Sequence, residues 1–211
     1  MRNTIIYILI SFIYINAFSQ TKNDLECEKK EKFEAVNNYL SSVIKDKNKE
    51  IIIVKKKTNV SEILRLFKGN IIKDNLGYFV ERDGGAPEPL YNEKDFEIMK
   101  KKYQDQTSTY KRENFTNTLW DPEDFTYNKI IFENWEDVYL KMQKVLYPRE
   151  PVIQIFTLSE PIYYKSKQYL VIQISIGDTN SSGFPSRLIA IMKKIKGKWI
   201  IVNETRDYIM N

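Results

Sequence analysis

The C-terminal third of the chain contains three apolar, β-branched segments in succession, and these constrain the fold more than any other feature. They are residues 152–158, 169–176 and 188–195, and a shorter segment follows at 199–202. Each has the length and composition of a β-strand, and each break between them carries turn-forming residues such as Gly, Pro, Asn or Ser. The pattern therefore predicts an antiparallel β-meander.

The N-terminal part is predicted to supply helices. In residues 28–45 apolar side chains recur at three- and four-residue spacing, which is typical of a helix of about five turns with one apolar face. We expect this helix to lie across the meander. The same spacing and capping signals predict further helical segments at 58–67 (ended by Gly69 and Asn70), 93–104 and 135–146, and a helix start at 120–125 with Asp121 as N-cap. The predicted class is α+β, with N-terminal helices packed on a C-terminal antiparallel meander.

Shorter segments complete the prediction. Apolar runs at 51–54, 76–80 and 130–132 are typical of strands, residues 81–89 contain too much Gly and Pro for regular structure, and the polar residues 105–118 are expected to form a loop or a lid. In the strand at 169–176, Gln173 and Ser175 indicate the more exposed face. A sheet that is apolar on both sides needs a cover on each, or a pocket or partner on one.

The first 19 residues have the three parts of a secretory signal peptide. One positive charge precedes an apolar run from Thr4 to Ile15, and Ala17 and Ser19 provide the small residues before a cleavage site. The run is shorter than the about 20 residues of a membrane span. We therefore expect cleavage after Ser19, a single domain at 20–211, no membrane span thereafter, and a periplasmic or extracellular location. An uncleaved anchor is the alternative.

The charge of the chain does not identify a partner. The whole chain has 33 basic and 28 acidic side chains, and removal of residues 1–19 takes away one Arg, which leaves a net charge of +4. Basic residues cluster at 55–57 and 100–102, but nucleic-acid-binding proteins concentrate charge more strongly. No nucleic acid is expected. The single cysteine, Cys27, is expected either to stay free or to pair with a second chain.

The residue types exclude many kinds of active site. The chain has no histidine and one cysteine, so it has no Ser-His-Asp or Cys-His nucleophile, no His-ligated metal and no iron–sulfur cluster. It contains neither a phosphate-binding P-loop nor a dinucleotide-binding glycine pattern. No cofactor is predicted, and the residue types favour a non-enzymatic protein over an enzyme.

Carboxylate chemistry remains available at one place. Asp121, Glu123 and Asp124 follow Trp120, and acids beside large aromatic rings are typical of a carbohydrate groove or a two-carboxylate glycosidase. The alternative is structural, because acidic residues at helix starts stabilise the free backbone N–H groups while the Trp ring enters the core. These three acids are the candidate catalytic residues.

A second candidate lies in the break after residue 176. Asp178, Asn180 and Ser182 match the opening of a calcium-binding loop. The match then fails, because Ile189 stands where the bidentate Glu is required. A turn-rich hairpin loop explains the same residues, so these three are candidates and no metal is predicted.

Four short sequence segments resemble segments of known proteins: residues 17–20, 156–163, 168–171 and 197–199. With them the chain resembles uncharacterised small exported proteins of Bacteroidetes, in which such a meander closes the chain. The last third is also loosely similar to NTF2-like and cystatin-like domains. That resemblance implies a curved sheet around a long helix with a conical pocket, where enzymes of the group place Asp, His or Tyr.

Three functional hypotheses follow. The first is a non-enzymatic periplasmic or cell-surface module that binds a ligand or protein through the second face of the sheet or through residues 105–118. The second is a carboxylate-dependent hydrolase that acts on glycans or another envelope substrate. The third is an inhibitor of another enzyme, for which residues 81–89 are the candidate protruding loop.

Overall fold

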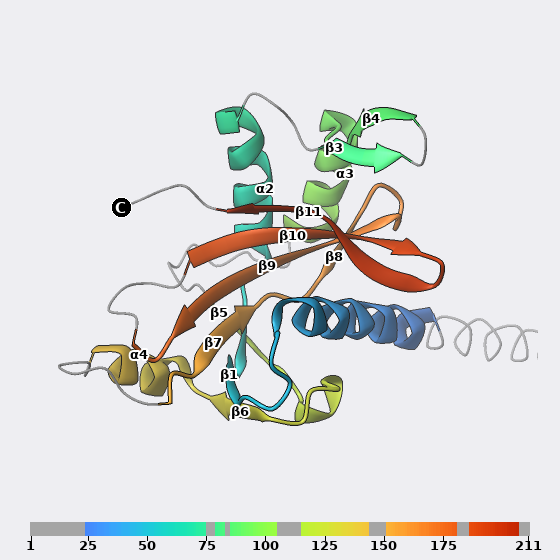
Figure 1. The fold of residues 1–211 in the computed structure, drawn as a ribbon. Helices are drawn as coiled ribbons and strands as arrows, with labels where there is room; N and C mark the ends of the chain where they lie inside the picture. Colours follow the sequence, from blue (N-terminus) through green and yellow to red (C-terminus); the bar gives the residue numbers. More distant parts are fainter. Residues whose placement is uncertain are drawn as a thin grey trace, which may run out of the picture.

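A computed structural model describes residues 24–74, 79–82, 85–104, 115–143, 151–180 and 186–206 of the chain. Its centre is a seven-stranded sheet with helices on both faces (Figure 1). The strands are mostly antiparallel, so the predicted α+β class is confirmed. No helix in the described ranges is long and apolar enough to cross a membrane.

The predicted meander forms one half of the sheet. Its strands are β7 (Gln154–Leu158), β9 (Tyr169–Asp178), β10 (Ser186–Ile195) and β11 (Lys198–Arg206). Each of these strands pairs antiparallel with the next. Lys196 and Gly197 form the turn between β10 and β11, both with positive φ, as a two-residue hairpin requires. The prediction from the apolar segments is confirmed here.

The other half of the sheet is parallel, which the sequence analysis did not predict. β1 (Ile51–Val54) lies between β6 (Ile130–Glu133) and β7 and runs parallel to both. The strands at 51–54 and 130–132 were predicted, but their place in the sheet was not. Parallel neighbours require long crossover connections, so no local turn signal records the pairing.

β8 (Ile162–Tyr164) was not predicted as a strand. Both β7 and β8 pair with β9, and Ser159 to Pro161 form the break between them. The turn from β8 to β9 is unusual, because Lys165, Ser166 and Lys167 all have positive φ without a glycine. Gln168 N donates to Lys165 O at 3.0 Å, so Ser166 and Lys167 are the central residues of a tight hairpin turn.

Replacement of Ser166 by a residue suited to this turn is expected to stabilise the protein. Ser166 has φ of 51° and is exposed. Asn tolerates this conformation better than Ser, so Ser166→Asn should raise the free energy of unfolding by about 0.5–1 kcal/mol. Ser166→Val should lower it, because a β-branched residue is poorly accommodated at positive φ. Urea titrations of the two variants provide the measurement, and equal stability would contradict the described turn.

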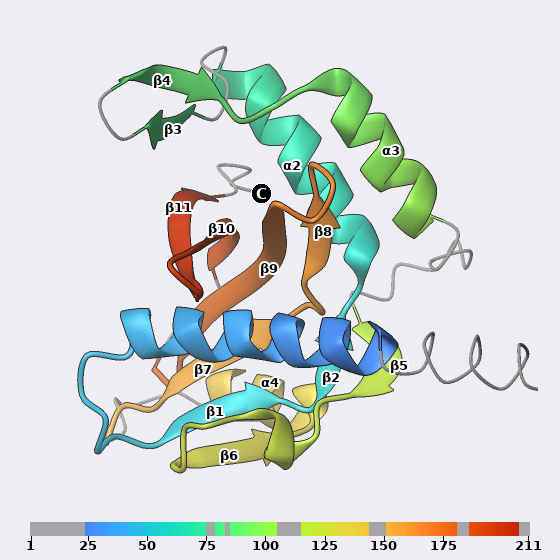
Figure 2. The same cartoon turned by 90° about the vertical axis from the view of Figure 1, so that its right-hand side faces the viewer.

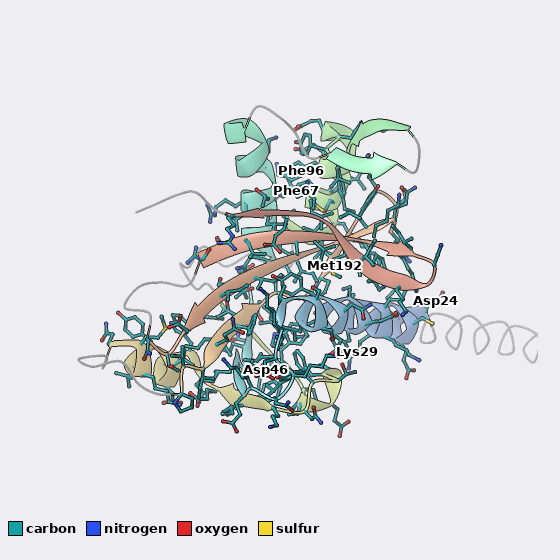
Figure 3. All side chains as sticks on the ribbon, viewed as in Figure 1. Asp24, Lys29, Asp46, Phe67, Phe96 and Met192 are labelled. Carbon is teal, nitrogen blue, oxygen red and sulfur yellow. The ribbon has the colours of Figure 1, made fainter. Side chains whose placement is uncertain are left out.

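The N-terminal helix, described over 24–43, lies across one face of the sheet, as predicted (Figure 2). Its apolar side contributes Ala35, Val36, Tyr39 and Leu40 to a core shared with alternate residues of the strands. Met192, labelled in Figure 3, belongs to this layer. Burial of this apolar face, rather than helix propensity alone, holds a helix of this kind in place.

The second face of the sheet is covered by three helices: α2 (Val60–Asp74), α3 (Glu93–Gln104) and α4 (Trp135–Gln143). Phe67 of α2 and Phe96 of α3 pack over the strands of the meander (Figure 3). Val138 and Met142 of α4 pack over β1 and β7. In the described part of the chain, the second face of the sheet is therefore covered by helices.

Helix boundaries differ from the prediction at several ends. The N-terminal helix is described over 24–43 rather than 28–45, and α2 begins at Val60 rather than at residue 58. α2 continues through Gly69 and Asn70, which were expected to end it. A glycine in a helix costs only about 1 kcal/mol, and the packing of α2 on the sheet outweighs that cost. α4 ends at Gln143 in the described structure, and the predicted residues 144–146 lie outside the described residues.

Two small ribbons flank the main sheet. β2 (Lys56–Thr58) pairs with β5 (Phe115–Leu119), and β3 (Phe79–Arg82) pairs with β4 (Gly85–Pro89). The expectation of irregular structure at 81–89 is wrong, because the Gly- and Pro-containing residues form the second strand of a hairpin. The predicted loop at 105–118 overlaps β5, and residues 105–114 lie outside the described residues.

A buried polar network, here called the Gln173 network, lies on the second face. The Thr58 hydroxyl donates to Gln173 Oε1 at 2.5 Å, and Gln173 Nε2 donates to the Ser175 hydroxyl at 3.0 Å. Ser159 Oγ accepts a hydrogen bond from Gln173 N at 2.9 Å. Gln173 and Ser175 are buried, so the expectation that they mark an exposed face is wrong. Their polar groups tolerate burial because they bind one another.

Candidate functional site

An open hollow of about 510 Å³ lies where β6 meets α4. Its lining combines charged, polar and apolar side chains: Lys55, Phe132, Glu133, Asn134, Asp137, Leu140 and Lys141. We call it the β6–α4 hollow. It lies at the carboxyl ends of the parallel strands β1 and β6, since Val54 and Glu133 are the last residues of those strands. In open sheets with parallel strands, ligands bind preferentially at this edge.

The pairing of β1 with β6 brings the charged residues of the hollow together. Val54 and Glu133 are partners in the parallel register, and Lys55 N donates to Glu133 O at 2.8 Å. Lys55 forms no ion pair with a residue in the described ranges. Its ammonium group is therefore available to an anionic or acceptor group of a ligand.

Glu133 and Lys141 form an ion pair across the hollow, from the end of β6 to the second turn of α4. Lys141 binds Glu133 Oε1, whereas Glu133 Oε2 is buried without a hydrogen-bond partner among the described residues. A buried carboxylate oxygen without a partner is costly.

The remaining lining residues give the hollow a mixed character. Asn134 Nδ2 donates to Asp137 Oδ2 at 3.3 Å at the start of α4. Phe132 and Leu140 supply apolar surface, and Leu140 is 49% exposed. With two lysines and two acids the lining carries no net charge. The arrangement suits a small polar ligand without a large net charge of its own.

The three candidate catalytic acids lie elsewhere, in a short 3-10 helix, η2 (Pro122–Asp124). Asp121 is its N-cap, as predicted, and accepts from Glu123 N at 3.1 Å, while Asp124 Oδ2 accepts from Asp121 N at 3.2 Å. The predicted helix start is thus a single turn with reciprocal caps. Trp120 is buried, and its indole N–H donates to Leu158 O at 3.3 Å. Asp121 and Asp124 are brought together, but as capping residues.

The candidate calcium residues are only partly described. Asp178 ends β9, and its carboxylate accepts from Asn180 N at 2.8 Å, which is the hydrogen bond of an Asx turn. Ser182 lies outside the described residues. Within the described ranges, no group of three or more Asp, Glu, Cys or His side chains is arranged to hold a metal ion.

At a second charged site, ion pairs connect the N-terminal helix with the break between β7 and β8. Glu160 binds Lys32 at 2.7 Å and Lys57 at 3.4 Å. Lys57 is buried, with its ammonium 4.5 Å from the ring centroid of Trp120. Burial by itself raises the pKa of the Glu160 carboxyl, but the ammonium groups of Lys32 and Lys57 outweigh burial and hold that pKa below 4.5.

This ion-pair site predicts a specific pH dependence of stability. Because the folded-state pKa of Glu160 is lowered, its stabilisation is fully present above the unfolded-state pKa and is lost as pH falls through the folded-state value. The difference in unfolding free energy between wild type and Glu160→Gln should be constant at neutral pH and should shrink below pH 4.5. Urea titrations across this range test it, with Glu136→Gln as an exposed control. A difference that grows on acidification would contradict the ion-pair assignment.

Comparison of the chain with protein-family models, with curated proteins and with solved structures found no match. The candidate site therefore depends on geometry. The sequence analysis missed the β6–α4 hollow, although Lys55 and Glu133 each follow the apolar residues of a predicted strand. Their position directly after a predicted strand was the only signal for the hollow in the sequence analysis. It indicates a common site only when the two strands are known to be parallel neighbours.

Proposed function

We propose that the protein is an exported, non-enzymatic binding module that holds a small polar ligand in the β6–α4 hollow. The hollow carries the proposal, because it joins a suitable volume to converging charged groups at the carboxyl ends of parallel strands. Its about 510 Å³ falls within the range of ordinary small-molecule sites. Export is proposed from residues 1–19 of the sequence.

The lining residues indicate which chemical groups such a ligand contains. Lys55 supplies an ammonium group for an anionic or acceptor group, and the carboxylates of Glu133 and Asp137 supply acceptors for a donor. Phe132 and Leu140 supply apolar contact area. A compound with both a donor and an acceptor on a small apolar frame satisfies these groups together. Polar groups of this kind fix orientation, while apolar contact contributes affinity.

The resemblance to NTF2-like and cystatin-like domains implies a pocket between the long helix and the sheet. In this chain Tyr39, Leu40 and Met192 are among the buried side chains that pack in that layer. We therefore propose the ligand site at the edge of the sheet instead. The hydrolase hypothesis gains no support from Asp121 and Asp124, whose carboxylates accept backbone hydrogen bonds.

The test is a variant that fills the hollow without disturbing the core. Leu140 lines the hollow and is 49% exposed, so Leu140→Trp should leave the fold intact. Ile98→Trp on α3 is the matched control, because Ile98 is 59% exposed and does not line the hollow. Thermal unfolding is measured with free amino acids, neutral sugars and small organic acids as probes, followed by calorimetric titration of any stabilising compound.

We expect wild type and Ile98→Trp to bind a compound of this panel equally, and Leu140→Trp to bind it at least about tenfold more weakly. Lys55→Gln should weaken the same compound if its anionic or acceptor group meets Lys55. Equal binding by all three proteins places the ligand outside the hollow and overturns the proposal. Absence of binding by any panel compound also counts against a small polar ligand.

A further inference from the structure

Two charged side chains in the lining of the β6–α4 hollow have opposite signs and no ion-pair partners of their own. Lys55 has none among the residues that the structure describes. Asp137 accepts one long hydrogen bond, from Asn134 Nδ2 at 3.3 Å, and it too lacks an ion pair within the described ranges. The other two charges of the lining, Glu133 and Lys141, are paired with each other. One positive and one negative group are therefore left for a ligand to bind.

The charges next to these two groups do not change that balance. Their exposed neighbours in the sequence are Lys56 and Glu136, which carry one charge of each sign. Lys57 is buried in a separate ion-pair site. The hollow and its immediate surroundings are thus close to neutral, and they favour a ligand whose own charges also cancel.

The backbone fixes the positions from which the two side chains extend. Lys55 directly follows β1, and its backbone N–H donates to Glu133 O at 2.8 Å. Asp137 lies in the first turn of α4, where Val138 N donates to Asn134 O at 3.1 Å. Both segments are therefore ordered before a ligand arrives. Less ordering on binding leaves more of the interaction energy as affinity.

The hollow also has apolar surface for the body of a ligand. Phe132 is half-buried, whereas Leu140 is 49% exposed. An aliphatic group that covers these side chains removes apolar area from water, which favours binding. The lining thus combines two opposite charges with an apolar contact area.

We infer that the ligand of the hollow is a zwitterion with an apolar side chain, namely a free α-amino acid or a short peptide of apolar residues. This inference rests on the proposed function of the hollow. The ligand carboxylate binds the ammonium group of Lys55, and the ligand α-ammonium group binds the carboxylate of Asp137. A ligand with a single charge leaves one of these two groups without a partner, and an uncharged ligand leaves both.

Calorimetric titration of the purified full chain tests the two contacts separately. Leucine and leucyl-leucine have both charges and differ in length, whereas N-acetyl-leucine lacks the positive charge and leucinamide lacks the negative one. The test variants are Lys55→Gln and Asp137→Asn. The matched control is Lys56→Gln/Glu136→Gln, which removes one charge of each sign from exposed residues that do not line the hollow. Circular dichroism melting establishes that each variant is folded.

We expect wild type and the control to bind leucine or leucyl-leucine at least about tenfold more tightly than either singly charged compound. Lys55→Gln should weaken leucine and N-acetyl-leucine about tenfold and leave leucinamide unchanged. Asp137→Asn should weaken leucine and leucinamide by a similar factor and leave N-acetyl-leucine unchanged. The tighter of leucine and leucyl-leucine identifies an amino acid or a peptide as the ligand.

Failure of this inference can be distinguished from failure of the proposed function. The zwitterion is overturned if a singly charged compound binds wild type as tightly as leucine and leucyl-leucine do, or if the control variant loses as much affinity as the test variants. It is also overturned if only a sugar or an organic acid binds. In these cases the hollow remains a ligand site as long as Leu140→Trp blocks binding. If no compound binds, or if Leu140→Trp binds as wild type does, the proposed function fails as well.

Discussion

Ile172→Ala is expected to remove about 2–5 kcal/mol from the free energy of unfolding. Ile172 has no exposed surface, and it lies in the middle of β9 within the core shared with the N-terminal helix. Loss of its outer methyl groups leaves a cavity between sheet and helix, because strands fixed on both sides cannot close around it. Such a loss is a large fraction of the stability of an ordinary domain.

Urea titration monitored by circular dichroism measures this effect. Ile200→Ala is the matched control, because Ile200 also lies in a strand of the meander but is 42% exposed. The control should lose less than about 1 kcal/mol. Similar losses for the two variants would mean that the N-terminal helix does not cover β9.

Gln173→Leu is expected to cost about 2–4 kcal/mol, although it replaces a polar residue in the interior by an apolar one. The change removes the acceptor of the Thr58 hydroxyl and the donor to the Ser175 hydroxyl. Both hydroxyls then lie buried with these hydrogen bonds lost. The penalty arises from the groups left behind rather than from the leucine itself.

A double variant separates this explanation from a simple packing defect. Thr58→Val/Gln173→Leu removes both partners of one hydrogen bond, so its cost should be smaller than the sum of the two single costs by about 1 kcal/mol. The comparison uses the free energies of unfolding of wild type, both single variants and the double variant. Strict additivity would show that the two side chains do not interact.

Local patterns predicted much of the fold. The meander followed from β-branched segments separated by turn residues, and Gly197 marked its last hairpin correctly. The N-terminal helix followed from its apolar spacing. The sequence signals for the meander and for the N-terminal helix each lie within a few neighbouring residues. The sequence was therefore sufficient to predict these two elements.

The missed features have two physical causes. The turn at Lys165 to Gln168 contains no Gly or Asn, so the hairpin between β8 and β9 lacked its usual signal. Gln173 was interpreted as exposed because its partner, Thr58, is distant in the sequence. A polar side chain in a strand indicates solvent only when no partner is available inside the protein.

The candidate site could not be predicted from the sequence for a related reason. Lys55 and Glu133 are adjacent because two parallel strands end together, and this pairing has no sequence signature of its own. Asp121 and Asp124, which were predicted as candidate catalytic acids, do lie close together. Their spacing in the sequence, however, makes them capping residues of the short helix η2.

The position of β1 has a consequence for the order of assembly. β1 contains residues near the beginning of the domain, yet its two neighbours, β6 and β7, come from far later in the chain. During synthesis, the early segment is therefore made long before either neighbour. Contacts between distant parts of a chain form slowly. The central part of the sheet, where β1 pairs with β7, is thus completed only when the last third of the chain has been made.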